Sequence, residues 1–322
     1  MALTAPNRAG GYRGLPPEPS ESLMIRWTMN ILNLLKWIAT HPLNRREPLG
    51  PVKGLGRFFQ WQIASRVLPA GSTLPFVDQT VLLVERGMTG ATGNWYCGLH
   101  EPSEMGFLLH SLRPDDTFVD VGANVGSYTL LAGTVGAQVV SLEPIPNTFR
   151  RLRNNVHLNM MEGRTELLNL GVSKESGSLR FTRSLDTMNR VALPGEVMET
   201  VAVPVRSLDE ILYGRSASLL KIDVEGHELA VLEGAQATLA NPTLRAVIME
   251  TNSAGNKYGV SDQQLFQNME YHGFRLFAYN PIRRQLSASV PGRANSIFLR
   301  DPELVEATCK SAPTYQLCNG SI

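Results

Sequence analysis

The densest group of ionisable side chains in the sequence lies in residues 223–228. Asp223 ends the apolar stretch Leu219–Ile222, and Glu225, His227 and Glu228 follow within five residues. Such a cluster suits acid–base chemistry: His227 is the best candidate base by its ordinary pKa, and Asp223 by its position at a strand end. We therefore predict catalytic roles for Asp223, His227 and Glu228. The alternative is that Asp223 caps a helix, with His227 and Glu228 on its solvated first turn.

A second run, Phe118-Val-Asp-Val-Gly-Ala-Asn-Val-Gly-Ser-Tyr128, combines a strand, a glycine turn and the start of a helix. This order is typical of a nucleotide-binding α/β sheet. Gly122 allows a positive φ angle, and Asn124 tolerates the left-handed region better than most residues. Gly126 lets a ligand or a strand approach the backbone. The predicted cofactor contacts in this run are Asp120, Gly122, Ala123, Asn124 and Gly126.

The acid before the turn indicates what kind of ligand binds. Asp120 lies two residues before Gly122, which is unfavourable for a pyrophosphate but suits the cationic amino-acid end of S-adenosylmethionine (SAM). Glu143 ends a second strand, 23 residues after Asp120, where an acid can accept hydrogen bonds from both ribose hydroxyls. Asn169 closes a third strand that we expect to face the adenine. The alternative is an ordinary glycine turn, with Glu143 capping a loop and Asn169 serving as a turn residue.

Apolar stretches predict the strands that must hold these groups. Strands are expected at residues 117–121, 138–142, 166–170, 217–222, 245–250, 274–279 and 295–299, and helices between most of them, for example at 148–158 and 227–239. This alternation specifies an α/β fold: a Rossmann-like, doubly wound, mainly parallel seven-stranded sheet with helices on both faces. Ligands of such sheets bind beyond the carboxyl ends of the strands, so the two runs should meet there. The insert 177–205 breaks the alternation and predicts extra strands around a loop at 184–199.

A helical extension is expected before this domain. The predicted divisions are a disordered N-terminus (1–21), an N-terminal extension (22–100), the catalytic domain (101–305) and a C-terminal tail (306–322). The extension should begin with an amphipathic helix at 22–40, in which Trp27, Ile31, Leu34 and Ile38 share one face. Residues 80–97 predict β-structure with a glycine turn.

Positive charge is concentrated in this extension. From residue 22 to residue 77, seven Lys or Arg residues accompany one acid, Glu47. A basic amphipathic stretch can lie on an anionic membrane, so a peripheral membrane contact through residues 22–66 is one interpretation. The other is a helix that docks on the main domain and leaves its cations solvated.

Composition bounds the remaining possibilities. A net charge of +1 argues against an extensive nucleic-acid footprint. The three cysteines have no metal-binding spacing and the carboxylates match no known metal signature, so we predict no metal site. No secretory signal and no uncharged run of membrane-spanning length are visible. We therefore expect a cytoplasmic protein. The alternative is a protein that also contacts the inner face of the membrane. The sequence does not indicate the oligomeric state.

At these residues the chain resembles the FkbM-type methyltransferases, a family of SAM-dependent class I methyltransferases. The matching segments are Phe118–Tyr128, Leu142–Pro144, Leu220–Leu229, Val231–Ala235 and Val247–Glu250. The resemblance implies methyl transfer from SAM, usually to a hydroxyl oxygen of a sugar, glycan or polyketide-type product. It implies that the glycine turn with Asp120 holds the methionine end of SAM, that Glu143 holds the ribose, and that Asp223 lies close to the transferred methyl group. The acceptor varies within the family and is not implied.

We therefore predict a SAM-dependent O-methyltransferase with a small-molecule or glycan hydroxyl acceptor. Residues predicted to bind that acceptor are Arg183, Asn189, Glu101 and Glu250. A SAM-binding scaffold without catalysis, or a membrane-docked partner, is the alternative. An NAD-dependent oxidoreductase is disfavoured by the acid before the loop and by Asn124 in place of a glycine. A nucleic-acid methyltransferase is disfavoured because Asp223 is followed by Val-Glu-Gly and because net charge is close to zero.

Overall fold

The structure is a computed structural model that describes residues 21–322, apart from 69–70, 184–188, 194 and 293. The disorder predicted for residues 1–21 therefore lies outside the described residues, except for Glu21, which begins α1. The side chains of the first half of α1, through Asn30, are also outside the description.

The core of the molecule is an eight-stranded sheet with the order β12-β11-β13-β10-β9-β3-β4-β5. Its strands are β3 (Thr117–Val121), β4 (Gln138–Leu142), β5 (Thr165–Leu168), β9 (Leu219–Ile222), β10 (Ala246–Thr251), β11 (Arg275–Asn280), β12 (Gln285–Ala288) and β13 (Ala294–Leu299). Strands β5, β4, β3, β9 and β10 are parallel neighbours, and β13 runs antiparallel between β10 and β11. The seven-stranded, mainly parallel prediction is confirmed, with β12 as an additional edge strand.

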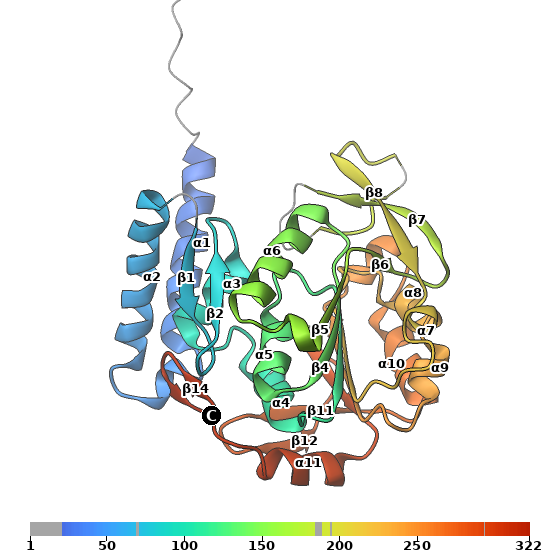
Figure 1. Cartoon of the computed structure of the whole chain (residues 1–322). Coiled ribbons are helices and arrows are strands. Elements are labelled where there is room, and N and C mark those ends of the chain that lie inside the picture. Colours follow the sequence, from blue (N-terminus) through green and yellow to red (C-terminus); the bar gives the residue numbers. More distant parts are fainter. Residues whose placement is uncertain (1–20, 69–70, 184–188, 194, 293) are drawn as a thin grey trace, which may run out of the picture.

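Helices cover both faces of this sheet (Figure 1). They are α4 (Pro102–Ser111), α5 (Ser127–Val135) and α6 (Pro146–Leu158) on one face, and α7 (Leu208–Ile211), α8 (Glu228–Glu233), α9 (Gln236–Ala240) and α10 (Asp262–Tyr271) on the other. Coverage on both faces explains why β9 is buried along its whole length and reads as an apolar run. The single helix predicted at 227–239 is divided at Gly234, where an added Cβ would lie 2.3 Å from the carbonyl oxygen of Ser173.

Strand register brings the chemically important residues to one edge. Val121 pairs with both Leu142 and Ile222, and Ile222 pairs with Met249. The residues that follow these four positions are Gly122, Glu143, Asp223 and Glu250. Parallel strands end at the same edge of a sheet, so these four residues lie around a single site.

Before the sheet lie a helical hairpin and a short β-ribbon. These are α1 (Glu21–Thr40), a turn of 3-10 helix (Asn44–Arg46), α2 (Gly50–Val67), β1 (Ser72–Pro75), β2 (Val81–Val84) and α3 (Thr89–Cys97). The prediction of β-structure over 80–97 is correct for β2 and wrong for 89–97, which is helical. Gly93, read as a turn residue, lies inside α3, where an added Cβ would lie 2.2 Å from the ring of His100. Small residues in α3 thus serve close packing instead of a turn.

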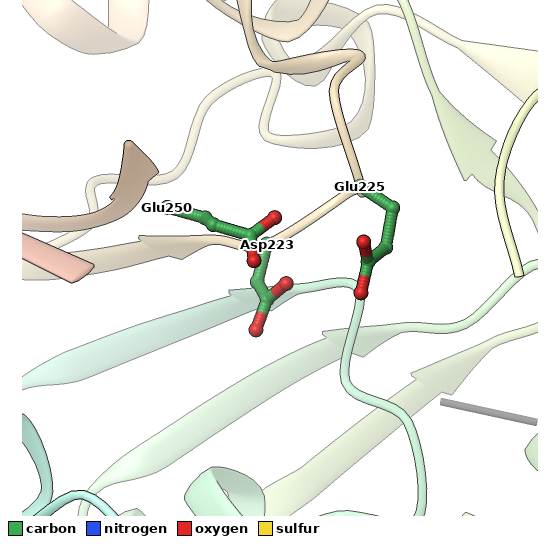
Figure 2. A group of neighbouring side chains, drawn as sticks. All are labelled: Asp223, Glu225 and Glu250. Atoms are coloured by element: carbon green, nitrogen blue, oxygen red, sulfur yellow. The ribbon is translucent and has the colours of Figure 1, made fainter. Parts of the chain in front are cut away.

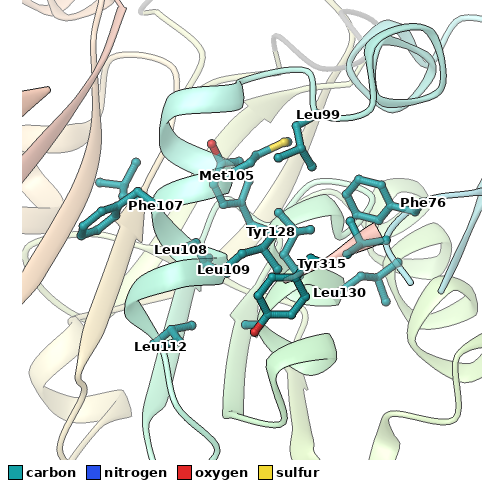
Figure 3. Packing of buried hydrophobic residues seen from close by; sticks show 14 of the residues in the cluster. Phe76, Leu99, Met105, Phe107, Leu108, Leu109, Leu112, Tyr128, Leu130 and Tyr315 are labelled. Carbon is teal, nitrogen blue, oxygen red and sulfur yellow. The ribbon is translucent and has the colours of Figure 1, made fainter. Parts of the chain in front are cut away.

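The N-terminal and C-terminal segments share a core with the eight-stranded sheet. Figure 3 shows Phe76 and Leu99, which precede the sheet, and Tyr315, which follows it, in the same cluster as Tyr128 and Leu130 of α5. The segment 306–322 contains most of α11 (Pro302–Lys310) and a hairpin of β14 (Gln316–Leu317) and β15 (Gly320–Ser321). A bridge between Val77 and Leu317 joins this hairpin to the residues after β1.

The insert after β5 forms a small sheet of its own. Its strands are β6 (Gly171–Val172), β7 (Gly177–Thr182) and β8 (Thr200–Arg206), in the order β6-β8-β7, which confirms the predicted extra strands. Among the helices of the described residues, none has both the length and the apolar character needed to cross a membrane.

Candidate active site

A cavity of about 300 Å³ lies at the carboxyl edge of the sheet, where β3, β4, β9 and β10 end. Its lining includes Gly122, Glu143, Asp223 and Glu250, the four residues that strand register brings together. Residues Met88–Ala91, at the start of α3, and Phe181 of the insert add apolar walls. The sheet therefore supplies polar groups, and the segments outside it supply much of the apolar surface, as in a typical small-molecule site.

The glycine turn has the backbone that its sequence predicts. Gly122 has φ 81°, and an added Cβ would lie 1.9 Å from the carbonyl oxygen of Asp223, so no other residue fits. Asn124 has φ 52°, in the left-handed region. Gly126 begins α5 with φ 96° and packs against Leu152, outside the cavity lining, so it shapes the turn without facing the ligand.

Glu143 is held in place by the glycine turn. Its Oε2 accepts the N–H of Asn124 at 3.0 Å, and its Oε1 accepts the N–H of Ile145 at 2.9 Å. The side chain is buried, and burial raises its pKa to about 7 despite these two hydrogen bonds. Each carboxylate oxygen keeps a lone pair that can accept a further hydrogen bond.

Two predicted cofactor residues support the cavity from outside. Asp120 is fully buried beneath the turn, where its Oδ2 accepts the hydroxyl of Thr129 at 2.7 Å. Burial raises its pKa, and the nearby cation of Lys221 opposes that rise. Asn169 donates to the carbonyl oxygens of Glu143 and Pro144 at 2.8 and 3.0 Å. Neither residue belongs to the cavity lining, so both influence the cavity only through the residues that they position.

Three carboxylates gather beyond the ends of β9 and β10 (Figure 2). One oxygen from each of Asp223, Glu225 and Glu250 lies within 4.8 Å of the others. Burial and the neighbouring acids raise the pKa of Glu225 to about 7 and that of Glu250 to about 9. Glu250 accepts a hydrogen bond from Asn252 at 2.6 Å on Oε1, while its buried Oε2 has no partner within the described residues. The cluster requires positive charge from a neighbour or from a ligand.

Lys221 supplies part of that positive charge, although it was not among the residues predicted from the sequence. Its Nζ lies 2.8 Å from Oδ2 of Asp223 and 4.7 Å from the ring centre of Tyr128, and its side chain is 4% exposed. Burial alone would favour the neutral amine, but Asp223 and Asp120 raise its pKa above the usual value. Residues two apart on a strand face the same side, so the Lys-Ile-Asp spacing was the available signal.

Tyr128 extends this network to the N-terminal segment. Its hydroxyl donates to Oε2 of Glu101 at 2.7 Å, and Oε1 of Glu101 accepts from Asn295 at 2.7 Å. Glu101 lines the cavity, as the prediction of an acceptor contact requires. The side chain of Glu101 therefore connects α5, β13 and the start of α4.

The turn after Asp223 depends on Glu228. Oε1 of Glu228 accepts the N–H groups of Val224 and Gly226 at 3.2 and 3.0 Å, and the side chain is 2% exposed and outside the cavity lining. Glu225 at φ 54° and Gly226 at φ 103° make this turn sharp. Glu228, predicted as catalytic, has the geometry of a positioning residue.

His227 faces the cavity from the same turn. Its Nε2 lies 3.0 Å from the hydroxyl of Ser173, and burial lowers its pKa. The predicted acceptor residues Arg183 and Asn189 have different positions. Asn189 lines the cavity, whereas Arg183 is half exposed, forms an ion pair with Glu199 at 2.5 Å and lies outside the lining.

Fold and site together agree with what is expected of a Rossmann-like methyltransferase. Residues 120–276 match the Methyltransferase FkbM domain, so this part of the chain is similar to the FkbM-type methyltransferases. The hexuronic acid methyltransferase AglP of Haloferax volcanii is 33% identical over 152 residues, which cover 45% of this chain and 60% of that protein. The 31-O-demethyl-FK506 methyltransferase FkbM of Streptomyces tacrolimicus is 29% identical over 213 residues, which cover 53% of this chain and 78% of that protein.

Proposed function

We propose that this protein transfers a methyl group from SAM to a hydroxyl oxygen of a polyhydroxylated acceptor such as a sugar, glycan or natural product. The observation that carries the proposal is the meeting of Gly122, Glu143 and Asp223 around one cavity at the carboxyl edge of the sheet. The two relatives support the acceptor class, because their names specify a hexuronic acid and a demethylated natural product.

The residues of the cavity fit SAM. Buried Glu143, fixed by two backbone N–H groups, suits a ribose diol. The excess of carboxylates suits a ligand with an ammonium and a sulfonium group and is unfavourable for a pyrophosphate, which bears on the NAD alternative. When bound, SAM supplies an activated methyl group on a positively charged sulfur. The protein then has to align the acceptor, which can contribute ~7–11 kcal/mol, and to remove its proton.

Asp223 is the proposed base. It lies at the cavity, 30% exposed, and its Oδ2 lies 2.8 Å from Nζ of Lys221. As the acceptor oxygen attacks, Asp223 takes the hydroxyl proton, and Tyr128 and Glu101 limit the movement of Lys221. His227 is the second candidate, since it reaches the cavity and is largely neutral because burial lowers its pKa. Glu250 and Glu225 are placed to accept hydrogen bonds from further acceptor hydroxyls.

The cavity also indicates which acceptors are disfavoured. Its described lining contains five carboxylates and a single Lys or Arg side chain, that of Lys221. Lys221 is already paired with Asp223, so no cation is left to bind an acceptor carboxylate. We therefore propose a neutral acceptor, in contrast to the hexuronic acid of the Haloferax relative's name.

Calorimetry with SAM, followed by tritiated-methyl transfer to glycan and metabolite extracts, tests the proposal. Asp223→Asn should keep SAM affinity within about threefold and lower turnover by ~10²–10⁴-fold, the usual contribution of a general base. Unchanged turnover would exclude Asp223 as the general base. A loss of turnover of ~10²–10⁴-fold in His227→Gln would then assign that role to His227. His157→Gln is the matched control, because His157 is exposed and lies far from the cavity lining. SAM binding without transfer to any extract would favour the non-catalytic scaffold.

A further inference from the structure

Helix α2 carries an apolar stripe that faces solvent. Val52, Phe59, Ile63 and Val67 are 65%, 56%, 68% and 70% exposed. Their spacing of seven, four and four residues places them on one side of the helix. The opposite side holds the buried residues of α2, among them Trp61, so the helix is apolar on both sides, and one of them has no partner within the described residues.

Neighbouring residues enlarge this surface. Leu32 of α1 and Leu49, just before α2, are each 63% exposed, and α1 and α2 pack side by side (Figure 1). The apolar face predicted for α1 packs on the protein itself, because Ile38 is fully buried and Leu34 packs against the core. Exposed apolar residues gathered along one side of a helix mark an interaction site in soluble proteins.

The charges around the stripe indicate the partner. Residues 31–68 contain six Lys or Arg side chains and one acid, Glu47, which pairs with Lys53. One of the six, Arg57, lies on the opposite side of α2 and donates to Asn44 and Tyr96, so it does not belong to this surface. Lys53 and Arg66 flank the stripe on opposite sides by their helical positions, and both are exposed. A second copy of the same surface would bring two positively charged faces together, which is unfavourable, whereas an anionic surface would be attracted.

We propose that the stripe on α2, with its flanking cations, docks peripherally on an anionic lipid bilayer. Phe59 and Ile63 enter the boundary between headgroups and acyl chains, while Lys53, Arg66 and Arg45 contact the headgroups. The docking uses the outer side of α2 and leaves the cavity residues untouched, so it is independent of the proposed methyl transfer.

Flotation of the full chain with two kinds of vesicle tests this. One is pure phosphatidylcholine, and the other contains one part phosphatidylglycerol to two of phosphatidylcholine. We expect binding to the anionic vesicles only, weakening as salt rises. The double variant Phe59→Ser/Ile63→Ser should lower partition at least about tenfold, because burying such side chains changes partition by that factor or more. Leu158→Ser/Leu304→Ser is the matched control, since these exposed leucines lie outside the stripe.

Each other outcome overturns the proposal. Absence of binding to anionic vesicles excludes it. Equal binding to both vesicles would show that the flanking cations have no role. Self-association in sedimentation that Phe59→Ser/Ile63→Ser abolishes, without any vesicle binding, would make the stripe an interface between copies of the chain. Unfolding of the variants is detected separately by their SAM affinity and melting temperature.

Discussion

Lys221 and Asp223 form a buried ion pair at the end of β9, with 2.8 Å between Nζ and Oδ2. The two side chains differ in exposure, because Lys221 is 4% exposed and Asp223 30% exposed. One partner is thus enclosed by protein while the other reaches the cavity. The pair places a carboxylate beside a buried cation at the point where an acceptor hydroxyl would arrive, so removal of the cation tests what the pair contributes to turnover.

Lys221→Met keeps the side-chain length but removes the charge. The cluster of Asp223, Glu225 and Glu250 would then lack the cation that lowers the pKa of Glu225 and Glu250, so it should hold more protons at neutral pH. We expect turnover to fall about 10²-fold at neutral pH and to recover partly as pH increases, because the cluster releases those protons. The measurement is the pH profile of kcat beside that of Lys174→Met, a control at an exposed lysine paired with Glu233. A uniform loss at every pH would indicate a structural role only.

Glu143→Gln should weaken SAM binding by about 10–100-fold. The amide has one acceptor oxygen, so it cannot serve both backbone N–H groups and the ribose hydroxyls. In the wild type the pKa of Glu143 is raised to about 7, and a cationic ligand favours the ionised carboxylate. SAM affinity should therefore rise with pH through about 7 and be accompanied by proton release. Calorimetry in buffers of different ionisation enthalpy measures both effects; Glu162→Gln, at an exposed site, should change neither.

Glu250→Gln should stabilise the ligand-free protein at alkaline pH. The pKa of Glu250 is raised to about 9 by burial and by Asp223, so the folded state binds its proton more tightly than the unfolded state. The stabilisation by that proton is complete below the ordinary pKa and is lost as pH rises toward about 9. The variant should melt about 2 °C or more above the wild type at pH 9, and the advantage should vanish near pH 4. A pH-independent difference in melting temperature would contradict this origin.

Chelation of divalent metals should leave activity unchanged. Asp223, Glu225 and Glu250 are close enough to bind a cation, an arrangement that their sequence spacing did not indicate. Lys221 already supplies compensating charge, and SAM would add more when bound, so we still predict that no metal is required. Initial rates with EDTA, and after re-addition of Mg²⁺, measure this. A rate that falls with EDTA and returns with Mg²⁺ would assign the cluster a metal.

The sequence predicted well those features whose cause lies in neighbouring residues of the chain. The left-handed Asn124, the positive φ of Gly122 and the apolar strands follow from short-range chemistry, and register then places Glu143 beside the turn. The sequence could not reveal roles that depend on packing between segments far apart in the chain. Glu228 looks catalytic in sequence because nothing local reveals that it accepts the N–H groups of its own turn. Helix α3 was missed because Gly93 packs against His100, which only the folded chain brings near.

Helix α3 has one end at the cavity and one side against α2. Met88–Ala91 line the cavity, while Tyr96 stacks edge-on with Phe58 of α2 at 5.5 Å. Exchanging only residues 120–276 between two such proteins would transplant the nucleoside half and leave the recipient's own pocket wall behind. Chimeras intended to change acceptor preference should therefore have their crossover before Gly87, upstream of the matched region 120–276.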